Sequence, residues 1–562
     1  MGTRMATTIS GLIPFGALRV TAGQQARMLL IGPYDPMGGE YTFLAPPLGV
    51  WRLAGFLHQH GIAADVFDPN CCAGPTEQAL ASLIASSRWD VVGVSTTGMT
   101  LQYDLALAHL VKRLQPDVRL IAGGMEATFK PESMLTLAPF DLVVLGEGER
   151  PLLEIASRVR QRAALEEIPG TAWRTADGTV RRLPAHALGR DELRDSIFQI
   201  PFERMPYRQY WDRLERRCRI GRLPMKADRE ARLAEIRSVR LITLNYCPMR
   251  CTFCSSTNFL NEAQGGTAKI ARLDAAECLA MIERIVKVQP DVRTVIFQDD
   301  IFVFRNDDRV LPLCDALTAA KADGRIPPDL QFISTNRIDA MTPERLRAMR
   351  RAGFRVLGFG VESFSLNILR EFNKAQIHPF IEPVLADALS VGITPFLDMI
   401  LSSPRCQVRD IAENVRQAFR WTVAGCEVGM YPYVIPFSGA AMANDPTLRP
   451  STVYERRHIA GTAASWEQAT KILPVDADAR TAILEIEAVY GEFLRTLADT
   501  PTHLPSRVRS LLWTLSAGSV LERYGCDMPR REAVMRALVN RLPAAAIRVL
   551  RPALPIEARG VV

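Results

Sequence analysis

The sequence predicts an α/β protein with two successive series of alternating strands and helices, followed by a helical C-terminal region. Between Arg27 and about residue 165, short apolar runs alternate with segments of helical spacing, which is typical of a doubly wound parallel sheet. The alternation resumes over residues 236–441, in the manner of a partial or complete TIM-type βα barrel. Beyond Met442 the strand signals stop, and amphipathic helical spacing dominates to the end of the chain.

The first series begins after an N-terminal extension, residues 1–26, that shows no clear periodicity. Glycine-containing loops follow several of its apolar runs, and helical spacing fits between them at 47–60 and 103–114. We therefore expect a Rossmann-like domain over residues 27–165. Its strands are expected at Met28–Ile31, Ala64–Phe67, Val91–Val94, Leu120–Ala122 and Leu142–Leu145.

Residues 166–235 are rich in Pro, Gly and charge, and we interpret them as a connector. The barrel is expected over 236–441, and the C-terminal helical domain over 442–562. Barrel helices are expected at 274–288, 343–351, 365–372 and 409–424. Barrel strands are expected at Leu241–Leu244, Thr294–Phe297, Leu330–Ile333, Val356–Phe359 and Pro395–Leu397.

Composition and charge exclude several classes of protein. Of 562 residues, 48 % are apolar and 23 % charged, and the net charge of +7 is a mild excess that gives no reason to expect nucleic-acid binding. No apolar run reaches the roughly 18 residues that span a bilayer, and the N-terminus lacks the pattern of a secretory signal. We expect a cytoplasmic protein without membrane contact, whose eleven cysteines are thiols or metal ligands and not disulfides.

The most specific motif is Cys247-Pro-Met-Arg-Cys251-Thr-Phe-Cys254, in a loop directly after an expected strand. Cysteine thiolates are the usual ligands of iron–sulfur clusters, and three of them can hold three irons of a [4Fe–4S] cube while the fourth stays open. The alternatives are a zinc site or free thiols. Zinc requires a fourth Cys or His, but the next cysteine, Cys278, falls inside an expected helix. The other cysteines are expected to be small buried residues: Cys71, Cys72, Cys218, Cys278, Cys314, Cys406, Cys426 and Cys526.

This cysteine motif resembles the CxxxCxxC signature of the radical S-adenosylmethionine (SAM) superfamily, including the aromatic Phe253 before the last cysteine. Downstream, Phe297–Phe302, Phe332–Arg337 and Gly358–Phe364 resemble the second, third and fourth barrel strands of that superfamily. The resemblance implies a cluster on Cys247, Cys251 and Cys254. It further implies that SAM is bound by Phe253, Asp299, Asp300, Ser334, Asn336, Glu362 and Ser363.

Upstream, residues 27–155 resemble the cobalamin-binding domain that precedes the barrel in one large branch of this superfamily. Glycine pairs at strand ends agree with this, because they let the backbone approach a bulky ligand and a phosphate. An ordinary Rossmann-like domain with tight turns is the alternative. The resemblance implies cobalamin contacts from Pro47, Leu48, Gly49, Ser95, Thr96, Thr97, Gly98, Gly123, Gly124, Glu126, Gly146, Glu147 and Gly148.

Two departures from the relatives concern the contacts to cobalamin. Relatives that ligate cobalt through histidine use a DxHxxG loop, whereas this chain has Asp35-Pro-Met-Gly-Gly39 after the first strand. We therefore expect no histidine below the cobalt. Many relatives also carry Pro-His after the double glycine, where this chain has Met125-Glu126.

The resemblance implies a methyltransferase of the cobalamin-dependent radical SAM branch. It would act on an unactivated carbon, or a phosphinate phosphorus, of a small molecule or peptide, in natural-product or cofactor biosynthesis, with an electron donor such as flavodoxin or ferredoxin. The alternative in the same architecture is a non-methylating rearrangement, ring closure, ring contraction or oxygen insertion. A non-enzymatic Rossmann-like sensor with a zinc knob is a different class. The substrate and the substrate-contacting side chains are not predicted.

Overall fold

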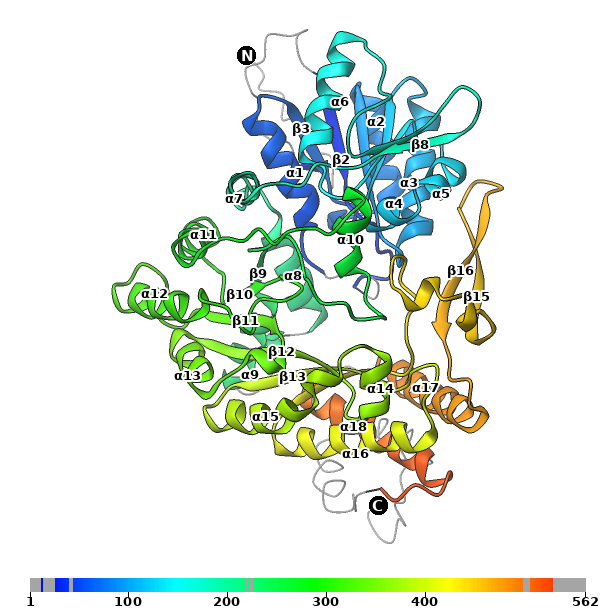
Figure 1. The fold of residues 1–562 in the computed structure, drawn as a ribbon. Helices are drawn as coiled ribbons and strands as arrows, with labels where there is room; N and C mark the ends of the chain where they lie inside the picture. Colours follow the sequence, from blue (N-terminus) through cyan, green and yellow to red (C-terminus); the bar gives the residue numbers. More distant parts are fainter. Residues whose placement is uncertain are drawn as a thin grey trace.

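The protein consists of two α/β units, one above the other, with a C-terminal segment that covers one end and one side of the second unit (Figure 1). This computed structural model describes residues 12–13, 26–39, 44–218, 220–222, 226–498 and 506–528. The order of the units is the expected one: a doubly wound sheet, then a βα series, then C-terminal helices. Within the ranges just given, no helix has both the length and the apolar character that crossing a membrane requires.

The N-terminal unit is an eight-stranded sheet in the order β1-β3-β2-β4-β5-β6-β7-β8. The strands from β3 to β6 in that order are parallel, while β1, β7 and β8 pair antiparallel at the two edges. The strand order reverses between β2 and β4, which is where open α/β sheets bind ligands. The strands are β1 (Leu12–Ile13), β2 (Arg27–Ile31), β3 (Ala63–Phe67), β4 (Val91–Thr96), β5 (Arg119–Gly124), β6 (Leu142–Val144), β7 (Thr171–Arg174) and β8 (Val180–Leu183).

Both faces of this sheet are covered, which explains the continuous apolar runs in the sequence. In β2, Met28 and Leu30 belong to one hydrophobic core, whereas Leu29 and Ile31 belong to a second core on the other face. The helices are α1 (Leu48–Gln59), the 3-10 turn η1 (Pro69–Cys71), α2 (Thr76–Ser86), α3 (Leu101–Leu114), α4 (Met125–Phe129), α5 (Pro131–Leu137) and α6 (Glu149–Gln161).

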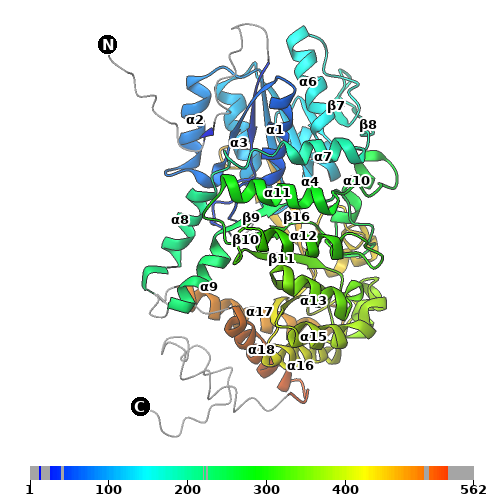
Figure 2. The same ribbon diagram turned by 90° about the vertical axis from the view of Figure 1, so that its left-hand side faces the viewer.

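The segment interpreted as a connector is more regular than expected. Its first part forms β7 and β8, so the N-terminal sheet continues to Leu183 and does not end near residue 165. Its second part is helical and packs beside both units, at the side shown in Figure 2. These helices are α7 (Arg190–Phe198), α8 (Tyr207–Arg217), η2 (Ile220–Arg222) and α9 (Lys226–Ile236).

The second unit is a six-stranded, all-parallel sheet in the order β14-β13-β12-β11-β10-β9, which makes it a partial barrel. Its strands are β9 (Ser238–Leu241), β10 (Thr294–Phe297), β11 (Gln331–Asn336), β12 (Phe354–Glu362), β13 (Thr394–Ile400) and β14 (Glu427–Tyr431). Its helices are α10 (Ser256–Gln264), α11 (Ala275–Val288), α12 (Val310–Ala322), η3 (Ile338–Ala340), α13 (Pro343–Ala352), α14 (Leu366–Glu371), η4 (Ala375–Phe380), α15 (Ile381–Ser390) and α16 (Val408–Ala424).

The C-terminal segment contains helices as expected, but a two-stranded antiparallel hairpin precedes them. The hairpin reaches back to the N-terminal unit (Figure 1), where Gln468 Nε2 donates a hydrogen bond of 2.7 Å to the Gly98 carbonyl oxygen. The expectation of helix from Met442 onward is therefore wrong for this stretch. The elements are η5 (Met442–Asn444), η6 (Pro446–Ser451), β15 (Thr452–His458), β16 (Ser465–Ile472), α17 (Ala477–Ala498) and α18 (Ser506–Glu522).

Candidate cofactor cavity and active site

A cavity of about 480 Å³ lies between the two units. Its upper wall is formed by the carboxyl ends of β2, β4 and β5, by α1 and by the loop that precedes α6, and its lower wall by the segments that follow β9 and β10 and by α10. Most residues expected to bind cobalamin line it: Pro47, Leu48, Gly49, Ser95, Gly123, Gly124, Gly146, Glu147 and Gly148. Asp299 and Asp300, expected near SAM, line the opposite wall.

The glycines of the cavity wall have two different roles. A Cβ atom built on Gly49 or Gly123 has no heavy atom within 4 Å, so these two positions open onto free space. Gly124 and Gly146 instead have positive φ angles of 97° and 69°. A Cβ at Gly146 would lie 2.6 Å from the Ala263 Cβ of α10, in the second unit. The wall is therefore shaped to admit a bulky ligand and to let the two units approach closely.

Four residues expected at the cobalamin site do not line this cavity. Thr96 Oγ1 donates to the Gly123 carbonyl oxygen at 3.0 Å, and Thr97 and Gly98 belong to the turn before α3. Glu126 accepts a hydrogen bond from Ser438 Oγ at 2.9 Å and pairs with Lys130. Gly98 and Glu126 instead line a smaller pocket of about 210 Å³ beside the hairpin β15–β16.

The loop after β2 forms a tight turn around a carboxylate. Asp35 accepts hydrogen bonds from the backbone N–H groups of Met37 (2.9 Å) and Gly39 (3.0 Å). His58 and His60 lie on and just after α1, where His60 Nδ1 is 2.9 Å from the Phe56 carbonyl oxygen. Among the described residues that line the cavity there is no histidine.

The cysteine motif lies in the loop between β9 and α10. The loop is held by the turn after α14: Thr252 Oγ1 donates to the Glu371 carbonyl oxygen at 2.8 Å, and Asn373 Nδ2 donates to the Arg250 carbonyl oxygen at 2.9 Å. The rings of Phe253 and Phe372 are 4.9 Å apart between centroids. Phe253 thus anchors the loop by packing, and its expected contact with SAM stays a prediction.

The three thiols of this loop are close enough to affect one another's charge. Burial is the main cause that raises the pKa of all three thiols, and for Cys247 it raises the pKa to about 12. The charges of Cys251, Cys254 and Asp300 add to the shift of Cys247. A cluster requires the deprotonated thiolates, so iron would have to replace these protons on binding.

The cysteines outside the loop differ in burial, and the structure shows no preformed metal site among the described residues. No group of three or more His, Cys, Asp or Glu side chains within the described ranges is arranged around one metal position. The remaining cysteines divide into two groups. Cys278, Cys314, Cys406 and Cys426 are buried as expected, whereas Cys71, Cys72, Cys218 and Cys526 are partly exposed.

Glu362, at the end of β12, forms a buried ion pair. Lys374 Nζ lies 2.9 Å from Glu362 Oε1 and donates a hydrogen bond of 2.6 Å to the Gly360 carbonyl oxygen. Glu362 has a positive φ of 62°, a strained conformation for a non-glycine residue. Arg337, whose charge also acts on Lys374, binds Asp339 through two hydrogen bonds of 2.8 Å. The pair lies beside the cysteine loop, since the Lys374 charge lowers the pKa of the Cys251 thiol.

Replacing Glu362 with Gln should weaken SAM binding and also lower the melting temperature, because it leaves the Lys374 ammonium buried without a counter-ion. The double variant Glu362→Gln/Lys374→Met removes both charges and should recover most of the melting temperature without recovering SAM binding. Isothermal titration with SAM and thermal denaturation of both variants measure the two effects. If the double variant binds SAM as the wild type does, Glu362 is a structural residue only.

Three other residues expected at SAM face away from the barrel interior. Ser334 pairs in register with Phe297, whose ring packs against Phe302 and Phe354 beneath the outer helices. Ser334 and Asn336 are 1 % and 3 % exposed and hydrogen-bond each other. Ser363 Oγ donates to Asn414 Oδ1 of α16 at 2.8 Å. Their side chains support the fold, and the structure does not bring them to the cavity.

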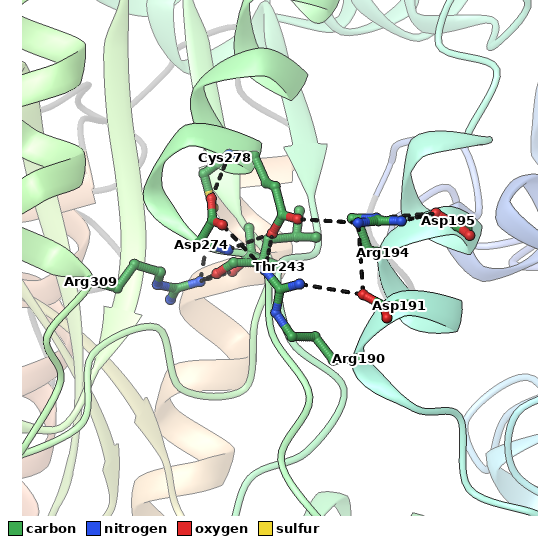
Figure 3. Close-up of polar contacts among 10 residues, drawn as sticks. Arg190, Asp191, Arg194, Asp195, Thr243, Asp274, Cys278 and Arg309 are labelled. Carbon is green, nitrogen blue, oxygen red and sulfur yellow. Dashed lines mark hydrogen bonds and ion pairs between the residues drawn. The ribbon is translucent and has the colours of Figure 1, made fainter.

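Asp299 shapes the start of the cysteine loop. Its carboxylate accepts hydrogen bonds from the backbone N–H groups of Thr243 (2.6 Å) and Leu244 (3.0 Å) and from Thr243 Oγ1. Burial raises the pKa of Asp299 to about 6. Arg309 Nη1 donates to the same Thr243 hydroxyl at 2.8 Å, and the contact lies next to the ion pairs of α7 with the start of α11 (Figure 3).

The inner face of the barrel carries residues that sequence analysis missed. Asp398 stands between Gly360 and Gly429 in register on the neighbouring strands. The Glu362–Lys374 pair occupies the space beside Gly360, and the Phe396 ring occupies that beside Gly429. Burial raises the pKa of Asp398 to about 7, and the Glu362 charge adds to the shift. Tyr431, on the next strand, is 54 % exposed although it lies in a sheet. The alternation along β13 and β14 could have indicated both, had β14 been predicted.

Comparisons with known proteins agree with this arrangement. Residues 34–156 match the family described as B12 binding domain, and residues 241–418 match the radical SAM superfamily. An uncharacterized methyltransferase of Pyrococcus horikoshii is 24 % identical over 337 residues, which are 58 % of this chain and 63 % of that protein. The anaerobic magnesium-protoporphyrin IX monomethyl ester cyclase of Rubrivivax gelatinosus is 26 % identical over 357 residues, 62 % of this chain and 57 % of that protein. The matched stretch thus spans about three-fifths of each of these relatives.

Among solved structures, the radical SAM methyltransferase TsrM from Kitasatospora setae, with cobalamin and a [4Fe-4S] cluster bound, shares the fold. The TM-score is 0.62 at 13 % identity, over 89 % of this chain and 100 % of that chain. The chain thus contains a B12-binding domain followed by a radical SAM domain. Its fold is shared with TsrM. These matches agree with the cobalamin-binding domain and the SAM domain expected from the sequence. The [4Fe-4S] cluster is bound in TsrM, and for this chain it stays a prediction.

Proposed function

We propose that the protein is a cobalamin-dependent radical SAM methyltransferase that acts on an unactivated carbon of a small molecule or peptide, in natural-product or cofactor biosynthesis. The observation that carries the proposal is a cavity shared by the two units. Its upper wall is the expected cobalamin site, and its lower wall leads to the cysteine loop. The methyltransferase relative from Pyrococcus horikoshii and the fold shared with TsrM support it.

The residues that would hold the cofactors follow from the geometry. Cys247, Cys251 and Cys254 would ligate the cluster, and the Glu362–Lys374 pair beside them would meet the polar groups of SAM. Gly49 and Gly123 leave room for the corrin ring. When bound, these groups supply an organic radical and a methyl donor, chemistry that belongs to the cofactors. An external electron donor such as flavodoxin or ferredoxin is part of the proposal.

The chain's own contribution is to place the cofactors and to exclude water. Leu244, Phe259 and Leu260 form an apolar part of the lower wall, opposite the glycines of the upper wall. Such a wall limits the access of water to reactive intermediates. The Asp299 carboxylate fixes the backbone between β9 and the cysteine loop, so the loop keeps one position relative to the cavity.

The proposal is tested by product analysis with methyl-labelled SAM. The full chain is loaded anaerobically with iron, sulfide and hydroxocobalamin, then incubated with a reductant, labelled SAM and candidate small molecules or peptides. Liquid chromatography–mass spectrometry should find a product that carries the labelled methyl group, together with S-adenosylhomocysteine and 5′-deoxyadenosine. Loaded protein that never forms 5′-deoxyadenosine would contradict the proposal.

The second candidate is a non-methylating reaction such as ring closure, which the cyclase relative from Rubrivivax gelatinosus favours. The same experiment separates the two. Formation of 5′-deoxyadenosine with an altered product that lacks the label would establish the second candidate.

A further inference from the structure

A second pocket, of about 210 Å³, lies where the hairpin β15–β16 meets the N-terminal unit. Three segments that are far apart in the sequence form it: the start of α3 together with α4, the loop after β14, and the hairpin. Two hydrogen bonds join these segments. Gln468 Nε2 of β16 donates to the Gly98 carbonyl oxygen at 2.7 Å, and Ser438 Oγ of the loop donates to Glu126 Oε1 at 2.9 Å. The hairpin therefore builds one wall of this pocket.

One side of the pocket is apolar although it is open to solvent. Met99 and Phe437 line the pocket and are 38 % and 39 % exposed, so they belong to the few large apolar side chains that the described part of the chain leaves exposed. Ile435, Pro436 and the ring of Tyr433 continue this side. Exposed apolar side chains that gather in a pocket indicate a ligand with an apolar body.

The other side of the pocket carries an excess of positive charge. Its charged residues are three cations and one carboxylate: Lys130, Arg457, Lys471 and Glu126. The two from the α4 segment pair with each other at 2.9 Å, so their charges cancel. Arg457 pairs with Glu455 at 2.8 Å, and this glutamate does not line the pocket. Lys471 pairs in the same way with Glu487 of α17 at 2.6 Å. Partly exposed ion pairs are weak, so both cations can also bind an anionic group that enters the pocket.

The pocket borders the cofactor cavity. Gly124, at the end of β5, lines the cavity, and Glu126, two residues further along the chain, lines the pocket. On the side of the barrel, β14 ends at Tyr431, and the loop that lines the pocket begins at Tyr433. A ligand held in the pocket would thus lie next to the cofactors without occupying their place.

We propose that this pocket binds the substrate of the proposed reaction through an anionic group, a carboxylate or a phosphate, carried on an apolar body. Arg457 and Lys471 bind the anionic group in this account, and Met99 and Phe437 contact the apolar body. The inference rests on the proposed function and adds the class of substrate, namely a small organic acid or phosphate ester. The pocket has room for one small group, so the reacting part of the substrate extends toward the cofactor cavity.

The first test measures binding of three probes to the full chain by ligand-observed NMR titration. The probes are hydrocinnamate, phenyl phosphate and the neutral hydrocinnamamide. The wild type should bind at least one of the two anions about tenfold more tightly than the amide, and the preferred anion tells carboxylate from phosphate. Arg457→Gln/Lys471→Gln should remove this preference, whereas Phe437→Ala should weaken all probes alike.

The matched control is Arg456→Gln. Arg456 is the neighbouring residue on β15, donates to Ser465 Oγ at 3.1 Å and does not line the pocket, so this variant should bind the probes as the wild type does. Anions that bind no better than the amide, or a double variant that keeps the preference, would overturn the inference. Saturation with hydroxocobalamin should leave probe binding unchanged, and competition between the two would overturn the assignment to this pocket.

The second test uses the loaded enzyme and an acidic compound that acquires the labelled methyl group. Arg457→Gln/Lys471→Gln should raise KM about tenfold and leave kcat unchanged, since it removes binding that the ground state and transition state share. Turnover of a neutral compound that the double variant does not affect would overturn the substrate role. If no compound acquires the label, the proposed function and the substrate role fail together, while the titration still decides whether the pocket binds anions.

Discussion

Replacing Cys247, Cys251 and Cys254 together with alanine is expected to abolish both iron binding and cleavage of SAM. The reason is the location of the thiols: these three share one loop and affect one another's pKa, whereas Cys278, Cys314 and Cys426 are buried on other elements. Iron analysis after anaerobic reconstitution and chromatography of 5′-deoxyadenosine measure the two losses. The wild type should hold about four irons per chain and the triple variant essentially none.

The controls for this variant are two cysteines outside the loop. Cys314→Ala removes a buried thiol of α12, and Cys526→Ala removes a partly exposed thiol after α18, and both should keep the cluster. About four irons per chain retained in the triple variant would show that the cluster ligands lie elsewhere. That result would remove the basis of the proposed radical chemistry while leaving the cobalamin domain unaffected.

Replacing Gly123 with Leu is expected to eliminate measurable cobalamin binding while the protein stays folded. The Cβ position of Gly123 meets no atom within 4 Å and opens onto the cavity, so a leucine side chain would occupy the space of the ligand without a clash in the unliganded fold. Dissociation constants for hydroxocobalamin should rise by at least about a hundredfold, which corresponds to roughly 3 kcal/mol of binding free energy.

Gly74→Leu is the matched control, because Gly74 also has free space at its Cβ position but does not line the cavity. It should bind cobalamin as the wild type does, and both variants should melt within a few degrees of the wild type. If Gly123→Leu binds cobalamin with unchanged affinity, the ligand does not lie against β5, and the cavity would have to be assigned to another molecule.

The sequence predicted the features that depend on local chemistry. The cysteine spacing predicts a cluster on one loop, which stays a prediction. Apolar runs that end in glycines predicted the parallel strands and most of the cavity wall. Such patterns are readable because strands buried on both faces need continuous apolar runs. Asp299 lines the cavity and its carboxylate accepts hydrogen bonds from the backbone at the start of the cysteine loop, so its expected contact with SAM stays a prediction.

What the sequence did not predict depends on contacts between distant segments. The sequence pattern predicts helix where the hairpin β15–β16 lies. The residues of β15 are partly or fully exposed, so this strand lacks the alternation of a half-buried strand. The sequence predicts Ser334 and Asn336 at SAM, but the register of Ser334 with Phe297 turns both side chains outward, because residues two apart share one face of a strand. The partner Lys374 lies on an element apart from the glutamate it holds, Glu362, and no local motif marks it.

We expect cobalamin to bind in the cavity between the N-terminal sheet and the cysteine loop, opposite the iron–sulfur cluster. An anaerobic crystal structure of the chain reconstituted with iron, sulfide, hydroxocobalamin and SAM would show both cofactors. We predict corrin density against Gly49, Gly123 and Gly148, and a cubic cluster on Cys247, Cys251 and Cys254. Corrin density outside this cavity, or a cluster on other cysteines, would contradict it.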